Sequence, residues 1–220
     1  MEGTSKEVTT PFLKKLAQKA KQLKAISMDM STAFFWAVSD ALPHVKIVFD
    51  RYHVMALMNR AIDKFRRAYQ LQLDDMNKKT MKGSRFLFLR NYHSLKPDKQ
   101  KSLDELLEVN APLHLIHSMK EQLRLFWETT KITDARDFLD AWCRDAMESG
   151  IKQLASVGKT LASYRTGLLN YFFHRITNGP VEGLNNKIKT LKRQAYGFRD
   201  MEYFKLRLYH LHTQRYSLSG

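Results

Sequence analysis

The sequence predicts an α-rich α/β fold, and three observations support this prediction. The chain has 220 residues, of which 44% are apolar, so it can bury a sizeable core. It contains only 9 Gly and 5 Pro, which favours long helices over a fold of many short strands. Strand and helix patterns alternate near the amino-terminal end, whereas from Tyr52 onward the apolar periodicity is helical almost throughout.

Two short strands are predicted in the first fifty residues. Residues 24–28 have the pattern of a buried strand followed by Asp29, and residues 45–49 are a β-branched strand followed by Asp50. A helix over 32–41 connects them. The order strand, helix, strand is that of a βαβ unit, so both strands should be parallel and each should end at an acidic residue.

Helical periodicity covers most of the remaining chain. An amphipathic helix over 6–23 precedes the first strand. Further helices are expected at 52–79, 84–92, 97–109, 111–130, 134–148, 151–170, 181–192 and 200–215. The periodicity predicts that the chain is mostly helical outside the two strands.

The chain is expected to form one domain in three parts. These are an α/β part over 1–51, a helical block over 52–176 and a basic tail over 177–220. From Lys159 to the end there are 11 Lys and Arg but only 3 Asp and Glu, so more than half of the net charge of +15 lies in the last third. Such a field favours a polyanion as partner, although a merely soluble basic protein would also carry it.

Composition excludes several classes of protein. The single cysteine, Cys143, rules out a disulfide framework and a cysteine-built zinc site, and its apolar surroundings indicate a small core residue. No run of about 18 apolar residues exists, so no membrane span is expected. The first 24 residues lack a hydrophobic signal core, so the predicted location is the cytoplasm.

Asp29 and Asp50 are the first candidate functional residues. Carboxylates at the ends of neighbouring parallel strands lie close together, on the side where open α/β sheets bind ligands. Oxygen ligands of this kind suit a hard cation such as Mg²⁺, and two such ions can activate a water for attack on a phosphodiester. Acidic residues at strand ends are also common turn residues, and this alternative stays open.

The segment around Glu182 is the second candidate. It follows the turn Asn178-Gly179-Pro180, and on a helix one face would carry Glu182 together with two amides and several cations. The amides and cations suited to contact DNA bases or phosphates are Asn185, Asn186, Lys189, Lys192 and Arg193. The alternative is a solvated helix face with an incidental glutamate.

Arg51 and His53 directly follow Asp50 in the sequence. Arg51 is expected to pair with an acidic group or a phosphate. His53 is a candidate contact to phosphate or to a metal-bound water, but a histidine at the start of a helix is also a common structural donor.

Two further segments are rich in basic or aromatic residues. Lys64, Arg66 and Arg67 form a basic cluster that would line a DNA groove or form a solvated face. Phe204 and Tyr209 lie among the cations of the tail, where aromatic rings can stack on bases, but their helical spacing favours a place in the core.

Four motifs occur in the order found in a known family. They are Ser27-Met28-Asp29-Met30-Ser31, Asp50-Arg51-Tyr52-His53-Val54, the segment from Thr177 through Asn185, and Lys192-Arg193-Gln194-Ala195-Tyr196-Gly197-Phe198. With them the chain, from about residue 3 to 210, resembles the DDE transposases of bacterial insertion sequences, in particular the L-three group. The match covers the carboxyl-terminal part of the catalytic domain of that family.

This resemblance implies a fold, a reaction and a set of site residues. The fold would be ribonuclease H-like with a large helical insertion before the last catalytic acid. The family cuts transposon ends and joins them to target DNA with Mg²⁺ or Mn²⁺ held by two Asp and one Glu, beside the bacterial nucleoid. Glu182 matches the family's glutamate, Asp29 matches its second aspartate, and Asp50 matches an aspartate of a further motif near the site.

The chain departs from the family at its amino-terminal end. The family's first catalytic aspartate lies on a strand that, with two partner strands, precedes the helix expected at 6–23. No residues before Thr4 supply these strands, so the expectation is an amino-terminally truncated copy with a truncated sheet. The alternatives are a catalytically dead DNA-binding remnant or an inhibitor of a full-length transposase. An uncovered strand edge would also favour pairing with a second copy.

Overall fold

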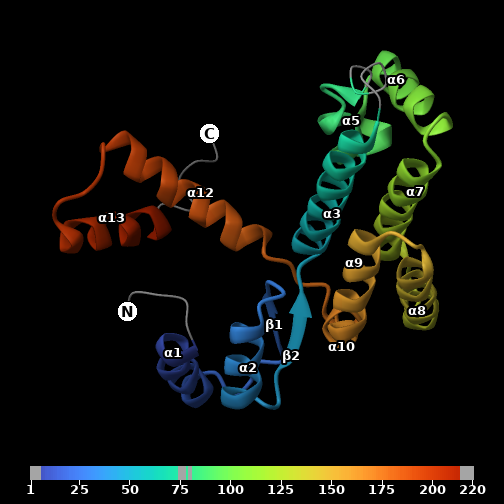
Figure 1. The fold of residues 1–220 in the computed structure, drawn as a ribbon. Helices are drawn as coiled ribbons and strands as arrows, with labels where there is room; N and C mark the ends of the chain where they lie inside the picture. Colours follow the sequence, from blue (N-terminus) through green and yellow to red (C-terminus); the bar gives the residue numbers. More distant parts are fainter. Residues whose placement is uncertain (1–5, 74–77, 79–80, 214–220) are drawn as a thin grey trace. The chain divides into compact units, whose positions relative to one another are not determined.

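A computed structural model describes residues 6–73, 78 and 81–213 of the chain (Figure 1). The chain divides into two compact units, residues 1–177 and residues 178–220. The second unit begins one residue after the start expected for the basic tail. Within the described part, no helix is both long enough and apolar enough to cross a membrane.

The first unit begins with a small α/β part. Its elements are α1 (Lys6–Lys19), β1 (Ala25–Met28), α2 (Thr32–Ala41) and β2 (Lys46–Phe49). The two strands form a parallel sheet in which Ala25 pairs with Lys46 and Met28 pairs with Phe49. The predicted strand–helix–strand unit is therefore confirmed, and so is the α-rich α/β class.

A helical block follows the sheet in the first unit. Its elements are α3 (Arg51–Gln72), α5 (Arg85–Leu89), η1 (Tyr92–Ser94), α6 (Pro97–Glu108), α7 (Ala111–Leu125), η2 (Phe126–Glu128), α8 (Ile132–Glu148), α9 (Lys152–Ser163), α10 (Arg165–Leu169) and α11 (Tyr171–His174). The expectation of one helix over 151–170 is wrong, because the chain leaves the helical geometry at Tyr164.

Phe49 at the end of β2 explains this interruption. Its ring lies 4.8 Å from the ring of Tyr164 in an edge-to-face arrangement. Gly167 in α10 packs so closely on Phe49 that a Cβ atom there would lie 2.3 Å from the ring. Asn170 also donates a hydrogen bond from Nδ2 to the carbonyl of Ile47, at 2.8 Å. The break between α9 and α10 therefore fits the chain closely against β2.

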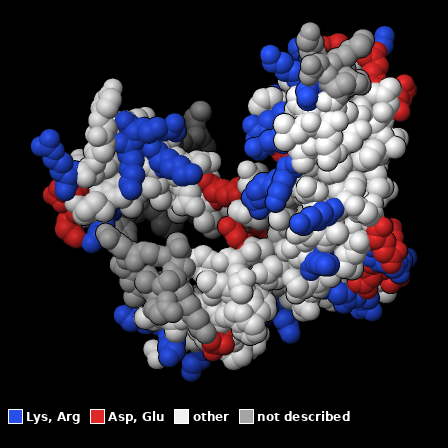
Figure 2. Space-filling model, in the orientation of Figure 1, with Lys and Arg blue, Asp and Glu red and all other residues white. Residues whose placement is uncertain are grey.

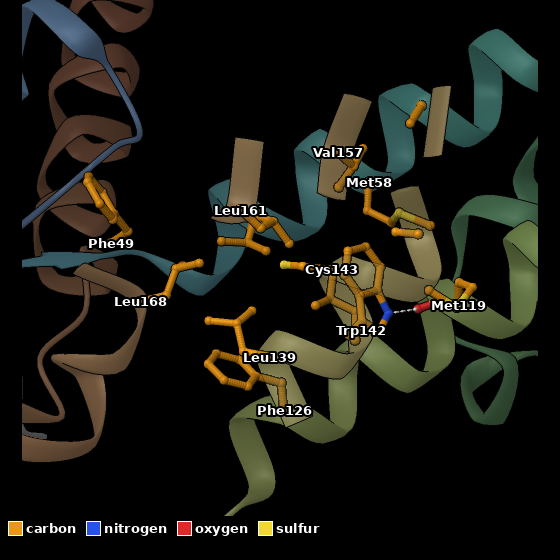
Figure 3. Packing of buried hydrophobic residues seen from close by; sticks show 14 of the residues in the cluster. Phe49, Met58, Met119, Phe126, Leu139, Trp142, Cys143, Val157, Leu161 and Leu168 are labelled. Carbon is orange, nitrogen blue, oxygen red and sulfur yellow. Dashed lines mark hydrogen bonds between the residues drawn. The ribbon is translucent and has the colours of Figure 1, made fainter. Parts of the chain in front are cut away.

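The core of the helical block is built from buried aromatic and aliphatic side chains (Figure 3). Trp142 is buried and donates from its indole nitrogen to the carbonyl of Met119 at 2.9 Å. Cys143 beside it is also buried, which confirms it as a small core residue. Burial in this apolar site raises the pKa of the Cys143 thiol to about 11, so the thiol stays protonated at neutral pH.

Lys120 is a fully buried cation at the centre of this block. Its ammonium donates to the carbonyls of Phe88 and Arg90, each at 2.7 Å, and lies 2.8 Å from a carboxylate oxygen of Glu121. These contacts join α7 to the last turn of α5. Burial lowers the pKa of Lys120, and the neighbouring Glu121 opposes that shift.

The second unit consists of α12 (Gly179–Gln194) and α13 (Met201–Thr213). The end of α12 has a Schellman pattern, since the amide of Gly197 donates to the carbonyl of Lys192 at 2.9 Å. Phe204 is buried and confirms the expected core position. Tyr209 is 72% exposed, so the expectation that it lies in the core is wrong.

Candidate functional site

Asp29 and His53 lie together at the carboxyl end of the sheet. Asp29 immediately follows β1, and its side chain is 50% exposed. His53 lies in the first turn of α3, and its Nε2 atom is 2.7 Å from Oδ1 of Asp29. This contact links the end of β1 to the helix that follows β2.

Asp50 lies at the same edge of the sheet. Its amide donates to the carbonyl of Met28 at 3.2 Å, which continues the ladder between the two strands by one residue. Its carboxylate accepts a hydrogen bond from the amide of Tyr52 at 2.7 Å and caps the amino terminus of α3. The residue is only 4% exposed. The sequence carried a signal for this cap, because an Asp stood directly before a long helical pattern.

The donor set at this edge consists of two carboxylates and one imidazole. Carboxylate oxygens are the ligands that Mg²⁺ and Mn²⁺ prefer. Among the residues that the structure describes, no three His, Cys, Asp or Glu side chains come together as metal ligands. The sheet edge can therefore contribute Asp29 and Asp50 to a metal site, and a complete site requires a further ligand.

Glu182 lies in the first turn of α12, in the second unit. Its amide donates to the carbonyl of Asn178 at 2.9 Å, so the helix begins at the predicted turn. A carboxylate in the first turn is stabilised by the partial positive charge of the helix amino terminus. The proposed DNA-contacting residues of this helix are all exposed: Asn185, Asn186, Lys189, Lys192 and Arg193. The ammonium of Lys192 also lies 4.9 Å from the ring centre of Phe204.

Asp63 is a buried acid in α3 that the sequence pattern did not indicate. Its Oδ1 atom accepts a hydrogen bond from Arg66 at 3.0 Å and lies 3.5 Å from Nε of Arg85. Its Oδ2 atom accepts hydrogen bonds from both Nε, at 3.1 Å, and Nη2 of Arg67. Burial by itself would raise the pKa of Asp63, but the hydrogen bonds from Arg67 and Arg66 outweigh it and hold the pKa below its ordinary value. Arg66, which the sequence placed in an exposed basic cluster, is itself buried.

Arg51 stands at the start of α3 and is exposed. It lines a cavity of about 720 Å³ together with Tyr52, Asn59 and Trp127. The lining of this cavity therefore includes Arg51, the residue that follows Asp50 in the sequence.

Comparison with known proteins gives the family. A family model described as "Transposase", of the DDE type and the ISL3 group, matches residues 1–208. The chain is 37% identical over 210 residues to the transposase for insertion sequence element IS1001 of Bordetella parapertussis. This alignment covers 94% of this chain and 52% of that protein. It is 22% identical over 206 residues to the transposase for insertion sequence element IS1557 of Mycobacterium tuberculosis. This second alignment covers 83% of this chain and 46% of that protein.

The chain spans about half the length of the curated relatives that it matches. No solved structure matches it. The family model nevertheless covers nearly the whole chain, and the matched residues include the four motifs around Asp29, Asp50, Glu182 and Lys192. The chain therefore belongs to the DDE transposases of the ISL3 group.

Proposed function

We propose that this chain takes part in DNA transposition, as a portion of a transposase that cleaves DNA strands and joins them with the help of a divalent metal ion. One observation carries this proposal. Asp29 and Asp50 directly follow Met28 and Phe49, which pair with each other in a parallel sheet. Two carboxylates at one edge of such a sheet are expected in a ribonuclease H-like fold, and that fold is part of the proposal.

The metal-binding residues in this proposal are Asp29, Asp50 and Glu182. Their carboxylates fit Mg²⁺ or Mn²⁺ by the chemistry of their oxygen donors. A divalent ion bound there supplies Lewis acidity toward a phosphodiester and its attacking water. His53 holds the carboxylate of Asp29 through the contact of 2.7 Å, and Asp50 anchors the amino terminus of α3 beside it.

Residues of α12 would hold the DNA. Lys189, Lys192 and Arg193 are exposed cations for phosphate oxygens, whereas the amides of Asn185 and Asn186 can contact bases or phosphates. Arg51 would contact phosphate from the start of α3. The net charge of +15 is consistent with transposon ends and target DNA as the partners.

The proposal is tested by measuring Mn²⁺ binding to the purified chain. D29N and E182Q each remove one negative ligand with almost no change in shape. D145N and E148Q remove the same charges from exposed positions on α8 and serve as matched controls. We expect D29N and E182Q each to weaken Mn²⁺ binding at least tenfold, with the controls close to the wild-type chain.

The same five proteins are then incubated with labelled DNA that carries the ends of the insertion sequence, in the presence of Mn²⁺. Cleavage that requires both Asp29 and Glu182 would support the assignment. Equal Mn²⁺ affinity in all five proteins would show that these two residues are not ligands, and the proposed metal site would then be wrong.

A further inference from the structure

Two cavities adjoin each other along α3 in the first unit. One has a volume of about 490 Å³ and the other about 720 Å³, and Asn59 lines both. The two cavities therefore adjoin at this residue, and together we call them the α3 groove. It is a feature of the helical block of the first unit.

One end of the α3 groove is strongly basic. The smaller cavity is lined by four cations, Arg60, Lys64, Arg67 and Arg85, and by one acid, Asp63. Arg60, Lys64 and Arg67 follow each other at helical spacings of four and three, so they form one line along α3. Figure 2 shows Lys and Arg side chains gathered over the α3 side of the helical block.

Asp63 fixes the positions of two of these guanidinium groups. It is buried, and it contacts both Arg67 and Arg85, whose side chains are 68% and 53% exposed. One carboxylate therefore orders several arginines while the cluster keeps a positive net charge. Arginines ordered in this way are suited to bind phosphate oxygens, because less side-chain entropy is lost when they bind.

The other end of the α3 groove contains aromatic rings and buried polar atoms without partners. Tyr52 is 63% exposed at this end. The amide oxygen of Asn59 and the indole nitrogen of Trp127 are buried and have no hydrogen-bond partner. A buried polar group without a partner destabilises the structure, so a ligand with both donors and acceptors would stabilise this cavity. The edge of a nucleic-acid base carries both, and its face stacks on aromatic rings.

The two ends are separated by a distance that suits a short stretch of DNA. At about 1.5 Å per residue, α3 rises roughly 22 Å between Tyr52 and Arg67. This corresponds to about six nucleotides at roughly 3.4 Å each along a duplex strand. His53, which contacts Asp29, is the residue next to Tyr52. The groove therefore leads from the arginine cluster to the acidic edge of the sheet.

We propose that the α3 groove holds one DNA strand, with phosphates on the arginine cluster and an unpaired base in the cavity between Tyr52 and Trp127. This inference rests on the proposed transposase function and adds a second DNA-binding site in the helical block. The four cations of the smaller cavity favour a polyanion, and the aromatic end with its unpartnered polar atoms favours a polyanion that carries bases.

The phosphate end is tested with the double variant R60A/R67A. The matched control is R136A/R144A, which removes two exposed arginines from α8. The probe is a fluorescein-labelled duplex with a single-stranded overhang of six nucleotides, and a blunt duplex of the same length serves for comparison. We expect R60A/R67A to weaken binding of the overhang probe at least tenfold and to lower the slope of log affinity against log salt concentration by about 2. The control should change the affinity for this probe less than threefold.

The base end is tested with Y52L and W127F on the same two probes. W127F keeps a ring at this position but removes the indole N–H, and Y52L alters an exposed residue and so leaves folding intact. Wild-type chain is expected to bind the overhang probe more tightly than the blunt duplex. Both variants are expected to lose this preference while they retain their affinity for the blunt duplex. Thermal melting of each variant shows whether it is folded.

The outcomes separate this inference from the proposed function. If the wild-type chain binds neither probe, both are overturned. If it binds DNA but R60A/R67A and R136A/R144A behave alike, the α3 groove is not a binding site, and the proposed function stands. If the folded Y52L and W127F variants keep the preference for the overhang, the assignment of a base to the cavity is wrong.

Discussion

Asp29 and His53 make a contact of 2.7 Å, although 23 residues of chain, including α2 and β2, lie between them. Asp29 follows the first strand, and His53 belongs to the helix that follows the second strand. The imidazole therefore limits the rotamers of the carboxylate that we propose as a metal ligand.

Replacing His53 by Phe is expected to weaken Mn²⁺ binding roughly tenfold, because losing a hydrogen-bond partner behind a metal ligand typically costs 10–100-fold in affinity. Phenylalanine keeps an aromatic ring at this position but cannot hydrogen-bond to Asp29, so packing at the start of α3 should change little. The measurement is a calorimetric Mn²⁺ titration. H44F, at an exposed histidine before β2, is the control. Unchanged affinity in H53F would indicate that His53 does not position Asp29 for metal.

Asp50 has a measurable structural role as the cap of α3. Asp50→Ala removes the acceptor for the Tyr52 amide and should lower the free energy of unfolding by about 1–2 kcal/mol. Asp50→Ser retains a capping oxygen without the negative charge and should recover most of this loss. Urea unfolding measures both. If the serine variant is as unstable as the alanine variant, the carboxylate stabilises the fold through its charge rather than through the cap.

The buried side chain of His117 is expected to make the free energy of unfolding depend on pH. Burial, with a contribution from the nearby cation Lys120, lowers its pKa to about 4. In the unfolded chain a histidine binds its proton near pH 6.5, so the unfolded state takes up the proton first as the pH falls. The contribution of His117 to stability is therefore complete above about pH 6.5, decreases between pH 6.5 and 4, and is absent below.

Between pH 7 and pH 4.5 this group should cost the wild-type chain about 2 kcal/mol of unfolding free energy. H117L removes the titration and should show a correspondingly smaller decrease, whereas H114L, at an exposed histidine on the same helix, should behave as wild type. Urea unfolding at the two pH values is the measurement. Parallel losses in wild type and H117L would contradict the assignment.

The basic face of α12 predicts a difference between two triple variants in DNA binding. K189E/K192E/R193E should reduce DNA affinity more than K14E/K15E/K19E, which makes the same charge change on α1, because only the first set lies beside Glu182 on α12. The salt slope of the first variant should also fall by roughly 3. Filter binding at several salt concentrations measures both. Equal losses of affinity in the two triple variants would indicate a diffuse positive field rather than a specific DNA-binding face. Because Lys192 also contacts Phe204, a melting curve of the first variant shows whether its loss of affinity comes from unfolding.

The local sequence pattern determined most of the elements near the candidate site. The strand patterns before Asp29 and Asp50 and the helix pattern over 32–41 agree with β1, β2 and α2. These elements depend on residues close together in the chain, namely alternating or β-branched apolar residues and their flanking acids. Glu182 likewise occurs in the first turn of a helix because the Asn-Gly-Pro turn precedes it.

Other features depend on contacts between distant residues. The break at Tyr164 requires Phe49, which lies more than a hundred residues earlier in the chain. The burial of Lys120 requires the carbonyls of Phe88 and Arg90, and the burial of Asp63 requires Arg85 in another helix. No periodicity in the sequence indicates such burial, because a charged residue is normally assigned to the surface.

The sequence by itself determined the family of this protein, the order of its helices and strands, and the acids that end its two strands. Only the tertiary structure decided which charges are buried, that Tyr209 is exposed, and that Asn59, Trp127 and the arginines around Asp63 line two adjoining cavities. The physical reason is that backbone preferences and apolar periodicity act over a few residues, whereas a buried charge or a groove exists only when partners from separate elements meet.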